Sequence, residues 1–170
     1  MAIVQKITPC LWFDTSAEEA ANFYVSIFGS SGIETVTRYG RQGFERHGMP
    51  EGTVQTVTFR LGGQRFTALN GGPRYALSPA VSLVVHCESQ AEVDHFWGKL
   101  GEGGDPTWQV CGWLRDRFGL SWQVVPQALF SMIADKDAAK AGRVMAAVMQ
   151  MRKLDLATLQ RAYEGDRAST

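Results

Sequence analysis

Two stretches of the chain show the same succession of patterns: an apolar strand-like run, a capped amphipathic helix, and then alternating strand-like segments. The first helix is predicted to begin at the capping box Ser16–Glu19 and to end at Gly29, and the second to begin at Ser89–Glu92 and to end at Gly101. Apolar residues recur between these limits at helical spacing: Ala20, Phe23, Tyr24, Ile27 and Phe28 in the first, and Val93, Phe96, Trp97 and Leu100 in the second. The chain therefore repeats one unit at an offset of about seventy residues.

Strand-like segments surround both helices. They cover residues 7–13, 33–39, 53–61 and 64–70 in the first half, and residues 80–87, 107–113 and 120–125 in the second, where a fourth strand is short or missing. Two tandem β-α-β-β-β modules are the simplest interpretation, because one half-buried sheet with a single helix leaves edges and a face to cover. We expect an α+β fold, with modules at 1–74 and 75–130 and a helical extension at 131–170, all within one compact domain.

Two further regions fall outside the repeat. Residues 40–52 are rich in glycine and charge and are predicted to form a loop, either a solvated connection, or a lid or dimer contact. The tail carries an apolar helical stripe at Val144, Met145, Val148 and Met149, and a second short helix is predicted from Asp155, with Leu156, Leu159 and Tyr163 facing inward. We expect these helices to dock on the modules or on a partner subunit.

Composition narrows the class of protein. Hydrophobic residues make up 45% of the chain and charged residues 20%, which is ordinary for a globular protein. Seventeen basic and seventeen acidic residues cancel, so no global field would attract nucleic acid or an anionic membrane. No apolar run reaches the roughly 20 residues of a membrane span, and the first ten residues show no signal-peptide pattern. Cys10, Cys87 and Cys111 are odd in number, so we expect buried free thiols in a cytoplasmic protein.

Residues 111–126, CGWLRDRFGLSWQVVP, contain the most informative pattern. Leu-Arg-Asp-Arg-Phe-Gly predicts a charged turn, and a strand follows it. Because strand side chains alternate, Ser121, Gln123 and Val125 share one face of this strand, and Trp122 and Val124 share the other. The Ser121 hydroxyl and the Gln123 amide therefore lie on the same face of this strand.

Four segments, taken in order, resemble the PhnB-like branch of the vicinal oxygen chelate (glyoxalase and bleomycin-resistance) superfamily, often labelled 3-demethylubiquinone-9 3-methyltransferase. They are KITPCLWFDTSAEEAANFY, GGQRFTALNGGP, CGWLRDRFGLSWQVVP and VMQMRKLDLATLQRAY. The resemblance implies a glyoxalase-like fold with a curved mixed sheet in each module, a cavity enclosed by the sheets, and a homodimer.

Metal-using members of that superfamily supply His, Glu or Gln ligands from four cavity-facing strand positions. By the resemblance, these positions fall at Pro9, Phe66 (or Ala68), Ser82 and Gln123. Only Gln123 is a ligand type at all, and a catalytic divalent site needs about three protein ligands. We therefore expect no metal and no other cofactor.

Other polar groups remain candidates with two interpretations each. His86 shares a strand face with Ser82 and is either a base or replacement ligand, or a hydrogen-bonded residue at a strand end. Asn70 either places an amide at the cavity rim or starts a turn, and Cys111 is either a nucleophile or a packing residue. We assign no catalytic residue; the expected cavity residues are Gln123, Ser82, Asn70, His86, Trp113, Ser121 and Phe66.

Three functions are compatible with this pattern. The favoured one is a small-molecule binding protein with a metal-free cavity; the second is a lyase, isomerase or dioxygenase using a displaced metal, or acid–base chemistry at His86 or Cys111. The third is a dimeric structural module with a vestigial pocket, which a closed, dry centre would favour. Methyl transfer lacks support, because the glycine-rich run at 101–104 follows a helix and leads into a strand, the reverse of a nucleotide-binding turn.

Overall fold

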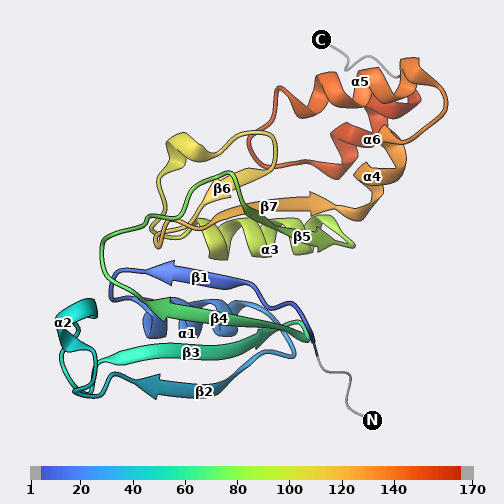
Figure 1. Cartoon of the computed structure of the whole chain (residues 1–170). Helices are drawn as coiled ribbons and strands as arrows, with labels where there is room; N and C mark the ends of the chain where they lie inside the picture. Colours follow the sequence, from blue (N-terminus) through green and yellow to red (C-terminus); the bar gives the residue numbers. More distant parts are fainter. Residues whose placement is uncertain (1–4, 166–170) are drawn as a thin grey trace. The chain divides into compact units, whose positions relative to one another are not determined.

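The computed structural model describes residues 5–165 and divides into two compact units, with the boundary between Leu77 and Ser78 (Figure 1). Residues 1–4, where part of the expectation of no signal peptide falls, and residues 166–170 lie outside the described part. Each unit has a mixed sheet with one helix packed on it, so the α+β class is confirmed. The finer division at residues 74 and 130 stays a prediction.

The first unit is a complete β-α-β-β-β module. Its elements are β1 (Cys10–Phe13), α1 (Ala17–Ile27), β2 (Gly32–Arg38), β3 (Val54–Leu61) and β4 (Gln64–Asn70), and the loop before β3 contains the short helix α2 (Phe44–His47). The strands lie in the order β1-β4-β3-β2, with β1 parallel to β4 and the other pairs antiparallel. Each of the four predicted strands is present in this half.

Strand alternation in this unit places large aromatic side chains under α1. Phe59 stacks between Tyr24 of α1, at 6.4 Å between ring centroids, and Phe66, at 5.6 Å. The expected capping box at Ser16 is wrong, since its hydroxyl makes no cap bond. The side-chain oxygen Oδ1 of Asn70 accepts the hydrogen bond of the Ala17 amide instead, at 2.8 Å.

The second unit begins with β5 (Ser82–Cys87) and α3 (Gln90–Gly101), and continues through the 3₁₀ turn η1 (Pro106–Trp108) to β6 (Trp113–Arg115) and β7 (Ser121–Pro126). The described part of this sheet has three strands, ordered β5-β7-β6, with β5 parallel to β7. Ser89 caps α3 as predicted, its hydroxyl accepting from the Glu92 amide at 3.3 Å, whereas the Glu92 carboxylate accepts from the Glu88 amide rather than from Ser89.

The predicted strand at 107–113 is replaced by η1 and an irregular segment. Cys111 and Gly112 have φ angles of 51° and 83°, a left-handed conformation that interrupts a strand. β6 therefore starts only at Trp113 and takes the first residues of the predicted charged turn, which shrinks to Asp116–Gly119. Among residues 78–165, the second sheet consequently has no counterpart of the fourth strand found in the first.

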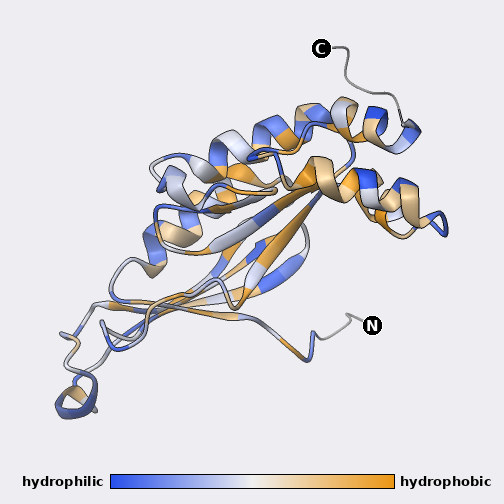
Figure 2. Ribbon diagram, turned by 90° about the horizontal axis from the view of Figure 1, so that it is seen from above, coloured by the Kyte–Doolittle hydropathy of each residue, from blue (hydrophilic) through white to orange (hydrophobic). Residues whose placement is uncertain are grey.

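Three helices complete the second unit: α4 (Gln127–Ile133), α5 (Ala138–Val148) and α6 (Leu156–Glu164). Their apolar stripes, visible in Figure 2 as orange bands beside blue ones, bury a small core with the end of β7. This core contains Val125, Leu129, Met132, Val144, Val148, Leu154 and Leu159. Asp155 caps α6, as the predicted helix start requires. Met145 and Met149, which were predicted to belong to the apolar stripe, are exposed. Helix α4 was not predicted from the sequence. No helix in the described residues has the length and apolarity to cross a membrane.

Candidate ligand-binding site

The face of the second sheet that points away from α3 gathers most of the expected cavity residues. Trp122 and Val124 of β7 are buried on the helix side, so the intervening Gln123 lies on the opposite face. The strand register places Ser82 beside Ser121, and Trp113 beside Gln123. The Gln123 amide Nε2 donates to the Ser82 hydroxyl at 2.9 Å, which fixes the direction of its side chain.

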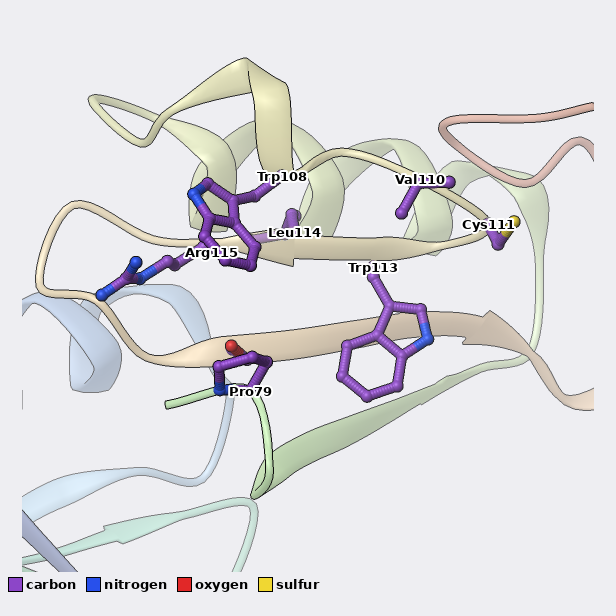
Figure 3. A pocket seen from close by; sticks show the side chains of 8 residues that line it. Pro79, Trp108, Val110, Cys111, Trp113, Leu114 and Arg115 are labelled. Atoms are coloured by element: carbon purple, nitrogen blue, oxygen red, sulfur yellow. The ribbon is translucent and has the colours of Figure 1, made fainter. Parts of the chain in front are cut away.

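A pocket of about 370 Å³ opens next to this polar group (Figure 3). Its lining is mainly apolar and comes entirely from the second unit: Pro79, Trp108, Val110, Cys111, Trp113, Leu114, Arg115 and Ser121. Figure 3 shows Trp108 and Arg115 at one end, Val110 and Cys111 at the other, and the Trp113 ring over β7. The volume lies in the range of small-molecule sites.

The pocket lies where the chain before β6 runs outside the sheet. The segment that leads into β6 leaves the sheet and presents Trp108 and Val110 to solvent, with 41% and 53% of their surfaces exposed. It is held at its end by backbone hydrogen bonds from Cys111 to Met151 and from Gly112 to Arg152, both 2.8 Å, while Gly112 accepts from Val124 at 2.8 Å. The pocket wall is thus anchored both to β7 and to the chain between α5 and α6.

Arg115 marks one end of the pocket. Its guanidinium lies 5.2 Å from the centroid of the Trp108 ring, and its Nε donates to the Gly119 carbonyl at 3.2 Å. The same arginine and tryptophan also line a second, polar hollow of about 390 Å³, together with Gly103, Gly104, Asp105, Asp116, Arg117, Phe118 and Gly119. An apolar and a polar compartment therefore meet at this cation–π pair.

Two acidic groups belong to the polar hollow, and both accept hydrogen bonds from the protein. Asp105 accepts from the amide and hydroxyl of Thr107, at 2.9 and 2.7 Å. These bonds, and more weakly the charge of Arg115, lower the pKa of Asp105 below its usual value.

Asp116 and Arg115 are two residues of this region that the sequence analysis did not single out. Asp116 is 3% exposed, and its carboxylate accepts from the amides of Phe118 and Leu120, at 2.9 and 3.0 Å, and from the Trp122 indole at 2.8 Å. An aspartate at the first position of a turn commonly accepts hydrogen bonds from the backbone amides that follow it. Asp116 precedes Arg-Phe-Gly in the sequence, so this role could have been predicted. Its role is to hold the turn between β6 and β7, and so to place Arg115 and Ser121.

Two expected cavity residues lie elsewhere. Phe66 and Asn70 sit on the helix side of the first sheet, where Asn70 also donates to the Val54 carbonyl at 3.0 Å and accepts from Tyr39 through its own carbonyl. Because side chains alternate along β4, Thr67 and Leu69 lie on the other face of the sheet. Asn70 is therefore a buried residue that joins α1, β3 and β4 by hydrogen bonds, and it does not lie at an open rim.

The two candidates for acid–base or nucleophilic chemistry, His86 and Cys111, differ in exposure: His86 is exposed and Cys111 is half-buried. The His86 ring packs at 5.1 Å from Phe130 of α4, and the Cys111 thiol lies 3.9 Å from the Met149 sulfur. Cys87 is buried, and burial, followed by the nearby Glu92, raises the pKa of its thiol to about 11. Cys10 is exposed rather than buried as expected.

The donor set around Gln123 does not fit the divalent metal centre that the superfamily implies. Its closest polar partner is the Ser82 hydroxyl, and its strand neighbours are Val84 and Trp113. Within residues 5–165, no three His, Cys, Asp or Glu side chains come together as a metal site. An amide already bonded to a hydroxyl supplies one weak ligand, which is too few.

The tandem modules and the sheet-face pocket define a glyoxalase-type α+β protein. A family model described as 3-demethylubiquinone-9 3-methyltransferase matches residues 5–125, so the chain belongs to this family, the PhnB-like branch of the glyoxalase superfamily. A solved PhnB protein from Bacillus cereus is similar, with 38% identity and a TM-score of 0.61 over 72% of this chain and 99% of the other. A protein from Pseudomonas aeruginosa shares the fold at 23% identity and a TM-score of 0.56, covering 73% and 98%. No curated protein matched.

The family match ends at the last strand. Helices α4–α6 follow residue 125, so the resemblance noted in the tail is not part of the family model. The family's descriptive name suggests a methyltransferase, but the glycine-rich run at 101–104 does not form a nucleotide-binding turn. It follows the last turn of α3, and Gly104 packs against β6, where a Cβ would lie 2.3 Å from the Arg115 carbonyl oxygen. The glycine there allows a loop to approach β6.

Proposed function

We propose that this protein binds a small, largely apolar molecule in the Trp108–Trp113 pocket, without a divalent metal at Gln123. The observation that carries the proposal is the pocket itself: about 370 Å³, lined by two tryptophans and several aliphatic groups, with few polar atoms. Apolar enclosure with a small number of oriented polar groups is typical of ligand sites. The Ser121 hydroxyl in the lining, and the Ser82–Gln123 pair on the same sheet face, would orient the ligand.

The aromatic groups are suited to a planar ligand. Trp113 is partly buried and Trp108 is 41% exposed, so both offer ring surface that a ligand would remove from water. Burial of aromatic area contributes roughly 25 cal/mol per Å², and ring stacking adds to it. Affinity is thus expected to come from ring contacts, and orientation from the hydroxyl and amide groups.

The enzymatic alternative has less support. An acid–base role for His86 or a nucleophilic role for Cys111 requires a polar partner within hydrogen-bond reach. In the part of the chain that the structure describes, the His86 ring contacts Phe130 and the Cys111 thiol contacts the Met149 sulfur, neither of which is a base. We therefore treat both residues as packing groups at the edges of the sheet face.

A fluorescence titration with N-phenyl-1-naphthylamine, a neutral aromatic probe, tests the proposal. Chelator-treated protein should bind one equivalent, and Trp113→Ala should weaken binding at least about tenfold, as truncation of an aromatic anchor does. Trp97→Phe, on α3 and outside the pocket lining, is the matched control and should bind as the wild type does. Absence of binding, or binding that needs an added divalent metal, would overturn the proposal.

We also propose a cytoplasmic homodimer, on the basis of the family relationship. Light scattering coupled to size-exclusion chromatography should then give about twice the chain mass of 18.7 kDa. A monomeric mass would remove this part of the proposal and leave the pocket unaffected, because every lining residue comes from one unit of one chain.

A further inference from the structure

We infer that the ligand of this pocket is amphipathic and acidic: an apolar, planar body with one anionic group, such as a carboxylate or sulfonate, that binds the guanidinium of Arg115. This inference rests on the proposed function and adds the chemical class of the ligand. Its basis is the junction at Arg115 and Trp108, the two side chains that line both the apolar pocket and the polar hollow.

The geometry of Arg115 leaves its recognition edge available. Its Nε is used by the Gly119 carbonyl, and its plane is near the Trp108 ring, which contributes no hydrogen-bond acceptor. Within residues 5–165, neither of its terminal nitrogens makes a hydrogen bond or an ion pair. A guanidinium that lies over an aromatic ring and is tethered at Nε presents its terminal N–H groups in a restricted direction, which favours bidentate binding of a carboxylate.

The position of Arg115 is set by rigid neighbours. Its strand partner is Ser121, which lines the pocket, and the turn that follows is held by the three hydrogen bonds to the Asp116 carboxylate. A Cβ on Gly119 would lie 3.1 Å from an Arg115 terminal nitrogen, so the glycine gives the guanidinium room. Little side-chain entropy remains to be lost when an anion binds, because the tether and the ring already restrict the arginine.

The surrounding charges set the size of the effect. Asp105 lines the same hollow, and the charge of Arg115 lowers the pKa of its carboxyl group. The Asp105 carboxylate would therefore repel a ligand anion bound to Arg115 and reduce the gain in affinity. Arg115 is also partly solvent-accessible, which weakens its attraction for an anion. We therefore expect a gain of about tenfold in affinity from the anionic group, near the lower end of the range for charged hydrogen bonds.

The test compares two probes that differ in one group. 8-Anilinonaphthalene-1-sulfonate has the ring system of N-phenyl-1-naphthylamine with an added sulfonate, so the ratio of their dissociation constants isolates the anion. On the full chain, at low salt and with a one-site stoichiometry established for each probe, we expect the sulfonate to bind about tenfold more tightly. Arg115→Gln should bring this ratio to about one, whatever its effect on the neutral probe alone, and Arg115→Lys should give an intermediate value.

Arg41→Gln is the matched control, because it removes the same charge from an exposed side chain in the first unit. It should leave the ratio unchanged. A wild-type ratio that falls from 20 to 500 mM NaCl would support the inference without any variant, and so covers the case in which Arg115→Gln does not fold.

The outcomes separate the two claims. If both probes bind with equal affinity, or if Arg115→Gln folds and keeps the tenfold ratio, the acidic ligand class is overturned and the pocket stands. If neither probe binds, the proposed function fails and the inference fails with it.

Discussion

Asn70 is the residue whose observed role differs most from its expected one. Its side chain accepts from the Ala17 amide and donates to the Val54 carbonyl, and it is 1% exposed. One amide thus replaces the Ser16 hydroxyl as the cap of α1 and joins the helix to two strands. Both ends of the Asn70 amide group are hydrogen-bonded within the first unit, so this side chain is not available to a ligand.

Replacement of Asn70 by alanine should lower the free energy of unfolding by about 2–4 kcal/mol, since it removes a helix cap and leaves a buried carbonyl unsatisfied. Ser16→Ala is the matched control and should change stability by less than about 0.5 kcal/mol, because its hydroxyl makes no cap bond. Urea denaturation measures both. Equal losses in the two variants would mean that Ser16 caps the helix after all.

Asp116 makes a prediction of the same kind in the second unit. Asp116→Asn keeps one oxygen for the amides of Phe118 and Leu120, but turns an N–H₂ group toward the Trp122 indole N–H, or the reverse after a flip. We expect a loss of about 2 kcal/mol in stability and a shift in near-ultraviolet circular dichroism from Trp122. Unchanged stability would show that the three bonds do not hold the turn.

The thiol of Cys87 should be inert at neutral pH. Its pKa of about 11 leaves a thiolate fraction of about one in a thousand at pH 8, against about one in ten for a thiol with an ordinary pKa of 9.0. Labelling of Cys87 in a Cys10→Ser/Cys111→Ser variant should therefore be slow, and should accelerate about tenfold per pH unit until the pH nears 11. Rapid labelling of the folded protein at pH 8 would contradict the burial of this side chain.

At the scale of elements, Gly112 connects the pocket wall to the tail. It has a positive φ, and a Cβ at this position would meet Leu154 at 2.9 Å and the Val124 carbonyl oxygen at 3.2 Å. The glycine lets the segment before β6 run between β7 and the chain after α5. This close approach is what orders the Cys111 end of the pocket.

Gly112→Ala should destabilise the protein by about 2 kcal/mol, through left-handed strain and displacement of Leu154. Gly142→Ala, in the middle of α5 with open space around it, should instead stabilise by about 0.5–1 kcal/mol. Thermal unfolding of the pair measures the difference. A neutral Gly112→Ala would mean that the tail yields easily at Leu154, and that the pocket wall is not fixed by it.

The helices and strands that could be predicted correctly are those marked by a clear pattern in the local sequence. Both module helices combine acidic residues in the first turn with apolar residues at helical spacing. β7 has a clear alternation, so Ser121 and Gln123 could be placed on one face of it. β6 was displaced because the positive φ of Cys111 is not visible in a sequence. Arg115 and Trp108 meet only after this backbone turn, so their contact could not be anticipated from spacing.

At the scale of the whole molecule, function is expected to be concentrated in one of two units. The first unit is a complete module whose buried polar group Asn70 bonds within the unit. The second unit has three strands in its described sheet, and it contains the pocket and the three helices α4–α6. The family match covers both units up to residue 125, so the helices that follow lie outside it. The second unit is therefore where we expect ligand specificity to be determined.

The most direct measurement is the response of the five tryptophan indole N–H signals in a ¹⁵N-labelled sample, titrated with N-phenyl-1-naphthylamine in the presence of chelator. Tryptophan-to-phenylalanine variants supply the assignments. We predict that Trp108 and Trp113 shift together and saturate at one equivalent, while Trp12 and Trp97 stay in place. Shifts confined to Trp12, or shifts that appear only after a divalent metal is added, would contradict a metal-free site on the second sheet.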